Sequence, residues 1–244
     1  MNYDPLADLY ALQYRNYRDD LHFYTRLADD YGSPVLELGA GAARVSAALG
    51  RAGHEVLALE LSEAMIAQGK ARLEDAGLTN VTYLRGDMRT VRLGRTFPLV
   101  IAPFNTLMHA YTLADQDATL QTVREHLKPG GRFAFDLYTP NFSELNVLRL
   151  EPEWRNLAGP ESDLFLLQTH DEDAQLLTTH YFLDVSEGGI LRRQRSTLTQ
   201  RYYHRFEIER ALRQNGFSET RLYGDFDRSR VSTRAPHLIG IAAL

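Results

Sequence analysis

The stretch VLELGAGAAR, Val35–Arg44, decides the fold of this chain. Its first four residues are mostly apolar, which is typical of a short buried strand, and the glycines after them allow a tight turn. Residues 44–51 then place Val45, Ala48 and Leu49 at helical spacing. A strand, a glycine turn and a helix in this order predict the start of a βαβ unit, where backbone N–H groups can approach a ligand closely.

The same alternation continues to about residue 135 and predicts a doubly wound α/β sheet with its ligand loops at the carboxyl ends of the strands. Further strands are expected at residues 54–60, 81–84, 99–102 and 132–137. Ser62 is a plausible N-cap for a helix that Gly77 ends, and Asp115 for a helix that runs to Leu127.

The segments on either side of this core differ in pattern. Residues 8–30 have helical character, with Tyr10, Tyr14 and Tyr17 spaced for one helix face. Three strands of period-2 character follow the core, at residues 164–169, 176–185 and 190–203, with a hairpin turn at residues 186–189. A helix at residues 206–213 and strands at residues 220–223 and 238–242 close the chain.

One domain with an embedded small sheet is the simplest organisation that fits these patterns. Within residues 1–244 we expect an N-terminal helical lid at 1–32, a cofactor-binding core at 33–140, an antiparallel insertion that caps the acceptor pocket at 141–204, and a C-terminal helix with closing strands at 205–244.

The composition and charge of the chain argue against several classes of function. A formal charge of −5 and no long basic run argue against a dedicated nucleic-acid binder. The chain has no cysteine, and its eight histidines lack ligand spacing, so we expect no metal site. No stretch is apolar enough to span a bilayer, and Met1–Pro5 does not resemble a signal peptide, so the expectation is a cytoplasmic protein without a membrane partner.

Acidic residues at the ends of the first three expected strands make the glycine turn more specific. Glu37 lies two residues before Gly39, where a carboxylate would repel a pyrophosphate but can accept a hydrogen bond from an ammonium. Glu60 ends the next strand, in place to hold ribose hydroxyls. Asp87 follows the third strand, where it can accept from an adenine amino group.

In these features the chain resembles the class I S-adenosylmethionine-dependent methyltransferases over residues 30–140, including an intact Leu-Lys-Pro-Gly-Gly turn at Leu127–Gly131. The resemblance implies a Rossmann-like, seven-stranded, mostly parallel sheet with an antiparallel last strand, and S-adenosyl-L-methionine as cofactor. The residues that it assigns to the cofactor in and around the core are Glu37, Gly39, Ala40, Gly41, Glu60, Leu61, Met65, Asp87, Met88 and Pro103. The chain departs from the family at Ala42 and Ala43, where Gly-x-Gly is often followed by Thr-Gly.

A narrower resemblance concerns the acceptor. Asn105–His109 is similar to the Asn-Ser-x-x-His stretch of glycine and sarcosine N-methyltransferases, and the flanking elements are similar to those of amino-sugar N,N-dimethyltransferases. It implies that Asn105 and His109 contact the acceptor, with His109 as the candidate base because histidine titrates near neutral pH. It also implies that an N-terminal helix brings Tyr10, Tyr14 and Arg18 to the cofactor.

These patterns predict an enzyme that transfers a methyl group to a small-molecule acceptor by in-line displacement, with proximity and orientation as the source of catalysis and N-methylation favoured. O-methylation and a catalytically silent cofactor-binding protein are the alternatives. A nicotinamide-dependent oxidoreductase is disfavoured because Arg44 occupies the position where dinucleotide folds need glycine or alanine. The identity of the acceptor, the need for a general base and the oligomeric state stay open.

Overall fold

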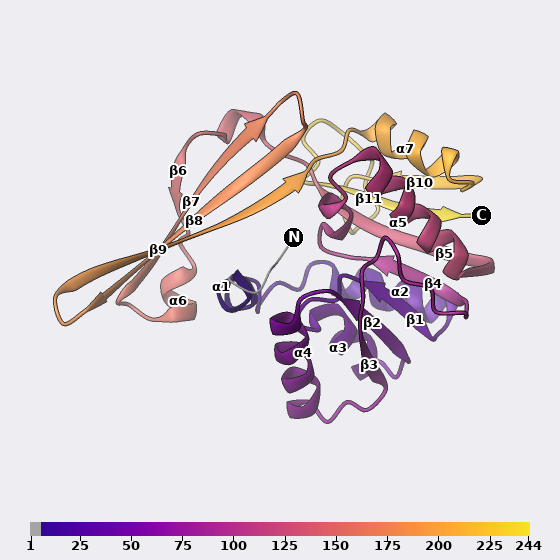
Figure 1. The fold of residues 1–244 in the computed structure, drawn as a ribbon, viewed down its shortest axis with the longest axis horizontal. Coiled ribbons are helices and arrows are strands. Elements are labelled where there is room, and N and C mark those ends of the chain that lie inside the picture. The colour runs from indigo at the N-terminus through magenta and orange to yellow at the C-terminus, as the bar shows by residue number, and fades with distance from the viewer. Residues whose placement is uncertain (1–5) are drawn as a thin grey trace. The chain divides into compact units, whose positions relative to one another are not determined.

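A computed structural model describes residues 6–244 and divides them into two compact units (Figure 1). The first unit contains residues 17–139 and 203–244, and the second contains residues 6–16 and 140–202. The N-terminal segment is thus shared between the units. Residues 1–5, for which the sequence predicts no signal peptide, lie outside the described residues.

The first unit is built on a seven-stranded sheet in the order β10-β11-β5-β4-β1-β2-β3. The strands are β1 Val35–Leu38, β2 Val56–Glu60, β3 Val81–Arg85, β4 Phe97–Ala102, β5 Leu127–Tyr138, β10 Glu219–Tyr223 and β11 His237–Ala243. β1 to β5 pair in parallel, and β11 runs antiparallel to both of its neighbours. The predicted mostly parallel sheet with an antiparallel last strand is therefore confirmed.

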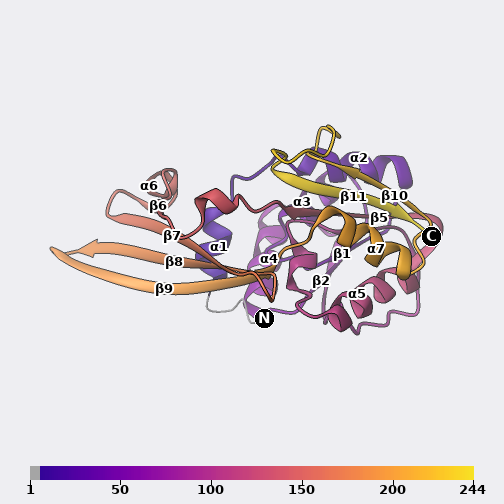
Figure 2. The same ribbon diagram turned by 90° about the horizontal axis from the view of Figure 1, so that it is seen from above.

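Helices cover both faces of this sheet, and Figure 2 shows α2 on one face and α5 and α7 on the other. The helices are α2 Leu21–Tyr31, α3 Arg44–Arg51, α4 Glu63–Asp75, α5 Leu113–His126 and α7 Arg205–Gln214. The core under α2 and α3 is apolar and includes Tyr24, Leu27 and Leu49, none of which is exposed to solvent. Because β1 and β4 are buried along their whole length, their sequences show no alternation.

The helix starts confirm one predicted cap and correct another. Ser62 accepts a hydrogen bond from the Met65 N–H at 3.2 Å and caps α4 as predicted. The cap of α5 is Thr112 and not Asp115, which instead occupies the third helical position and completes a capping box with the Thr112 backbone. A threonine three residues before an acidic residue was the signal for this start.

The second unit is a four-stranded antiparallel sheet in the order β6-β7-β8-β9, with two short α-helices and the 3-10 helix η3, Phe142–Glu144. Its elements are α1 Ala7–Gln13, β6 Leu148–Leu150, α6 Trp154–Ala158, β7 Ser162–Asp171, β8 Leu176–Glu187 and β9 Ile190–Arg201. The three predicted strands are confirmed, but β6 and α6 were not predicted because each is too short to show a period. Trp154 and Tyr181 are almost fully buried in this unit and pack its core.

The single tyrosine-bearing helix face predicted for residues 8–30 is wrong. α1 ends at Gln13, Tyr14 is its C-cap, and Tyr17 lies in the other unit. The chain then leaves the helix because residues 15–20 are polar except for Tyr17 and offer no apolar face to pack.

Candidate functional site

The glycine turn after β1 needs its glycines for two different reasons. Gly39 has a φ of 64°, and a Cβ there would lie 2.7 Å from the Thr106 side chain, so the turn packs directly against the loop after β4. Gly41 has a φ of 54°, and a Cβ there would meet nothing within 4 Å. The backbone at Gly41 therefore borders open space, as the approach of a ligand requires.

Glu60 at the end of β2 organises this turn. Its Oε2 accepts the Gly41 N–H at 2.9 Å, and its Oε1 accepts the N–H groups of Leu61 and Ser62, both at 2.8 Å. A carboxylate offers about four acceptor sites, so it retains capacity for a ligand hydroxyl. The position fits the predicted ribose contact of a nucleoside cofactor.

Glu37 is an acidic group that forms no ion pair among residues 6–244. It is buried under the turn and accepts a hydrogen bond from the Ser46 hydroxyl. Burial raises its pKa to about 8, although the Ser46 hydrogen bond and Arg44 oppose this shift. A cationic ligand group beside Glu37 would favour its charged form, so the residue fits a cofactor that carries an ammonium.

Arg44 at the start of α3 makes a buried ion pair that the sequence did not predict. Its guanidinium meets the fully buried Asp20 carboxylate in two parallel hydrogen bonds of 2.5 and 2.6 Å. The same group lies 5.0 Å from the ring centroid of Tyr17 and 4.7 Å from that of Phe104. Arg44 thus joins the glycine turn to the start of α2 and to the loop after β4.

Tyr83 on β3 is a second residue that sequence analysis missed. Its hydroxyl donates to the Gly41 carbonyl at 2.7 Å. Gly69 on α4 makes room for this side chain, since a Cβ at Gly69 would lie 2.0 Å from the Tyr83 oxygen. A glycine inside a predicted helix, which ordinarily lowers helix stability, was the available signal for such a close approach.

We expect Tyr83→Phe to weaken binding of S-adenosylhomocysteine about three- to tenfold, because one hydrogen bond that orients the turn is worth roughly 0.5–1.5 kcal/mol. Isothermal titration calorimetry checks this, with Tyr31→Phe as the matched control because Tyr31 lies on α2 at 36% exposure. Equal affinities for the two variants would show that the Gly41 carbonyl needs no such anchor.

Asp87 is already engaged in an ion pair. Its Oδ2 accepts from Nη2 of Arg89 at 2.6 Å, and Nη1 of Arg89 reaches Asp115 at 2.7 Å. The hydrogen bonds from Arg89 hold the pKa of Asp87 below its usual range. The carboxylate therefore stays charged and oriented after β3, and its contact with adenine stays a prediction.

The other core residues assigned to the cofactor differ in exposure. Leu61 is 43% exposed at the end of β2, an unusual position for a leucine. Met88 is half-buried. Ala40 in the glycine turn, Met65 in α4 and Pro103 in the loop after β4 are buried. An exposed leucine beside Glu60 suits a site that packs against an adenine, and the contacts of these residues with a cofactor stay predictions.

The loop after β4 carries both acceptor candidates. It leads into the short helix η2, Thr106–His109. The Asn105 Oδ1 accepts the Tyr138 N–H of β5 at 2.5 Å, so its side-chain nitrogen is the end that can donate to an acceptor. His109 Nδ1 lies 3.4 Å from the Tyr111 hydroxyl. Burial lowers the pKa of His109 to about 4, which moves it out of the near-neutral range on which its role as a base rested.

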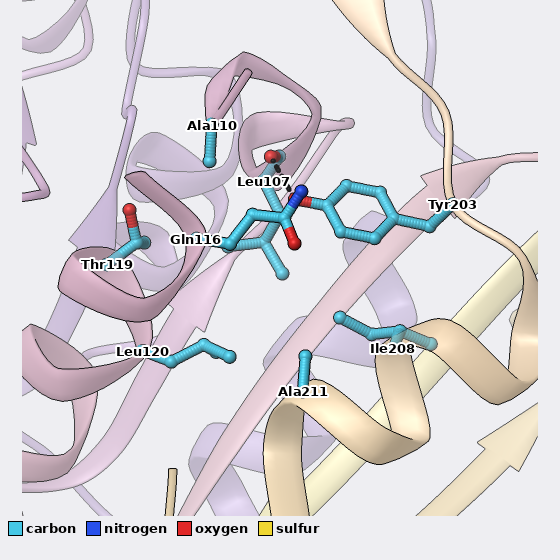
Figure 3. Close-up of a pocket in the computed structure, with 8 residues that line it drawn as sticks. All are labelled: Leu107, Ala110, Gln116, Thr119, Leu120, Tyr203, Ile208 and Ala211. Atoms are coloured by element: carbon cyan, nitrogen blue, oxygen red, sulfur yellow. Dashed lines mark hydrogen bonds between the residues drawn. The ribbon is translucent and has the colours of Figure 1, made fainter. Parts of the chain in front are cut away.

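Tyr203 supports the far end of this loop from the segment before α7. Its hydroxyl donates to the Leu107 carbonyl at 3.1 Å (Figure 3). A cavity of about 10 Å³ lies beside it, lined by residues that include Gln116 and Ile208. That volume holds a water molecule at most, so this cavity is a packing gap behind the loop and not a ligand site.

The three N-terminal residues predicted to contact the cofactor belong to two different units. Tyr10 and Tyr14 belong to the second unit, where their rings pack against each other in a tilted arrangement with centroids 4.8 Å apart. Arg18 belongs to the first unit, is exposed and donates to the Tyr17 carbonyl at 3.0 Å. Their contacts with a cofactor stay predictions.

Among residues 6–244, no three histidine, aspartate or glutamate side chains are placed to share a metal ion. Over the same part of the chain, no helix has the length and apolar character to cross a membrane.

Comparisons with known proteins place this site in a family context. Residues 35–131, which hold the glycine turn, Glu60 and the loop after β4, match a family model described as a methyltransferase domain. A dTDP-3-amino-3,4,6-trideoxy-alpha-D-glucopyranose N,N-dimethyltransferase from Streptomyces venezuelae is 41% identical over 73 residues, which is 30% of this chain and 29% of that relative.

Two further similarities extend over most of the chain. A dTDP-3-amino-3,6-dideoxy-alpha-D-glucopyranose N,N-dimethyltransferase from Streptomyces fradiae is 26% identical over 222 residues, covering 87% of this chain and 84% of that relative. The structure of the CcbJ methyltransferase from Streptomyces caelestis superposes with a TM-score of 0.81 at 25% identity, covering 98% of this chain and 96% of that one. The likeness therefore includes the second unit as well as the core.

Proposed function

We propose that this chain, which belongs to the class I S-adenosylmethionine-dependent methyltransferases, methylates the nitrogen of a small-molecule amine, and that the acceptor is an amino sugar linked to a nucleotide. The observation that carries the acceptor class is the similarity to the Streptomyces fradiae relative, whose name gives such a substrate, over 87% of this chain. The cofactor is S-adenosyl-L-methionine, and the turn with Glu37 and Glu60 fits its ammonium and ribose groups.

The cofactor supplies an electrophilic methyl group. The residues of the chain therefore need only bind the cofactor and the acceptor, orient them toward each other and exclude water. In-line displacement gains most of its acceleration from orientation, up to roughly 7–11 kcal/mol in well-aligned systems. Glu60 and the glycine turn would fix the donor, while the Asn105 amide would donate to the acceptor. His109 stays neutral at pH 7, and its imidazole can orient an amine that has lost its proton to water before binding.

A matched pair of acceptors tests the choice of nitrogen over oxygen. We expect methyl transfer to a dTDP-linked 3-amino sugar to exceed transfer to its 3-hydroxy analogue by about 100-fold or more in kcat/KM. The reason is that burial lowers the pKa of His109 to about 4, which makes its imidazole a weak base for deprotonating a hydroxyl. Faster methylation of the hydroxy analogue would establish O-methylation. Binding of S-adenosylhomocysteine without transfer to any amine would favour the silent binding protein.

His109 itself gives a sharper test of the acceptor site. We expect His109→Ala to lower kcat at least about tenfold through lost orientation, with the Kd for S-adenosylhomocysteine unchanged. Since burial lowers its pKa to about 4, the pH–rate profile between pH 5 and 8 should keep its shape. His54→Asn is the control, because that histidine precedes β2, at the amino ends of the parallel strands, and pairs with Asp29 of α2. Unaltered kinetics in His109→Ala would remove the residue from the mechanism.

A further inference from the structure

Two consecutive residues of the loop after β4 adopt an unfavourable backbone conformation. Phe104 and Asn105 have φ angles of 55° and 66°. Residues other than glycine rarely occupy this left-handed region, and they persist there only where the surroundings hold them. The loop that carries both acceptor candidates therefore depends on contacts from outside itself.

One buried carboxylate on β5 accepts the backbone N–H groups of both residues. Asp136 is 3% exposed, and its Oδ1 accepts the Phe104 N–H at 2.8 Å while its Oδ2 accepts the Asn105 N–H at 3.3 Å. The fully buried Tyr24 of α2 donates its hydroxyl to the same Oδ1 at 2.6 Å. Both oxygens are thus directed at the two strained residues, and Tyr24 fixes their orientation.

We propose that Asp136, oriented by Tyr24, is the positioning residue that fixes the loop after β4 for methyl transfer. Neither side chain is assigned to the cofactor or to the acceptor, so both act through Phe104, Asn105 and the residues that follow. The kinetic part of this inference rests on the proposed function, because it takes Asn105 and His109 as acceptor contacts. The structural part, that the pair holds the loop, does not.

The geometry predicts a dependence on pH. Burial raises the pKa of Asp136 to about 6. The groups that also act on it are Asp20, which raises the pKa, and Tyr24, the Phe104 N–H and Arg44, which lower it. Protonation places an O–H where an acceptor is needed, so the loop should loosen as the pH falls through about 6.

Stability should change in the opposite direction over this range. The folded state binds this proton more tightly than the unfolded chain, whose aspartates titrate near about 4, so Asp136 contributes stability at acid pH that is lost as the pH rises through about 6. A fall in kcat at acid pH that accompanies constant or rising stability would not come from unfolding, and its dependence on Asp136 is read from the variants.

Amide hydrogen exchange of the loop, read with the kcat–pH profile for a dTDP-linked 3-amino sugar, tests the inference. In Asp136→Asn the new side-chain amide faces the backbone N–H groups, so we expect exchange at Phe104 and Asn105 to rise at least about tenfold. kcat should fall by a similar factor and its pH profile should lose the inflection near pH 6, while the Kd for S-adenosylhomocysteine should change less than about threefold.

Tyr24→Phe is the second variant, and it keeps the test valid if Asp136→Asn folds poorly. It removes a hydrogen bond that lowers the pKa of Asp136, so the acid limb of kcat should move to higher pH. Asp29→Asn and Tyr31→Phe are matched controls on the same helix, and both should behave as the wild type. The ionisation of the acceptor is common to all variants.

Unchanged loop exchange in both variants would overturn the inference. So would faster exchange in the loop together with an equal increase in the core strand β1, because that pattern indicates general loosening. Absence of methyl transfer in the wild type would count against the proposed function alone, since the exchange measurement would still decide whether Asp136 holds the loop.

Discussion

Glu60→Gln should raise the Kd for S-adenosylhomocysteine by about 100-fold or more. The carboxylate accepts three backbone N–H groups from Gly41, Leu61 and Ser62, and hydrogen bonds to a charged acceptor are worth roughly 1.5–3 kcal/mol each. The amide nitrogen of glutamine would face at least one of these donors. A loss of about 3 kcal/mol corresponds to roughly 100-fold in affinity, even before the ribose contact is counted.

Glu63→Gln is the control for this variant, because Glu63 lies three residues later, is exposed and pairs with Arg85. Calorimetry should find the affinity of Glu63→Gln within about twofold of the wild type, as is typical of a surface pair. An affinity for Glu60→Gln within threefold of the wild type would mean that the turn holds its shape without the carboxylate and that the ribose lies elsewhere.

Arg44→Met should lower the free energy of unfolding by about 3–5 kcal/mol, because it leaves the Asp20 carboxylate buried without its partner. The double variant Asp20→Asn with Arg44→Met should recover much of this loss, since replacing both members of a buried pair is far less costly than removing one. Urea denaturation followed by circular dichroism measures both values.

Arg85→Met provides the matched surface control, with an expected loss of no more than about 1 kcal/mol. If the single variant at Arg44 lost as little as this control, the Asp20 pair would contribute nothing to the fold. If the double variant were as unstable as the single one, the loss would come from the packing of Arg44 against Tyr17 and Phe104, and not from the unpaired charge.

The core elements were predictable because each carries a local signal. α3 begins and ends at the predicted residues, and β2, β3, β10 and β11 differ from the predicted strands by a residue or two at their ends. A glycine turn after an apolar run and an acidic residue at the next strand end are recognisable within a few residues. The predicted turn at Leu127–Gly131 is wrong, because these residues form the first part of β5.

The supports of the site were not predictable because their partners are distant in sequence. Asp136 meets Tyr24 across 112 residues, and Tyr83 reaches the Gly41 carbonyl across 42. Such pairs leave no periodic pattern in the sequence. A single aspartate within an apolar strand, such as Asp136, does not indicate which distant residue it contacts. The titration of His109 was likewise invisible, since burial and not residue type sets its pKa.

The second unit shows the limits of periodicity itself. Long strands such as β8 were predicted, whereas three-residue β6 and five-residue α6 were not. Tyr10, Tyr14 and Tyr17 follow helical spacing, yet α1 ends at Gln13. The helix stops there because residues 15–20 are polar except for Tyr17. Spacing alone therefore cannot show where a helix stops.

Binding of S-adenosylhomocysteine to the wild-type chain, compared with binding of NADH, tests the central claim most directly. The claim is that Glu37, Glu60 and the glycine turn hold a nucleoside with an ammonium and not a dinucleotide with a pyrophosphate. Isothermal titration calorimetry should find one site with a Kd of about 1–100 μM for S-adenosylhomocysteine, roughly −8 to −5 kcal/mol, and no heat of binding for NADH. Saturable binding of NADH without binding of S-adenosylhomocysteine would contradict the account.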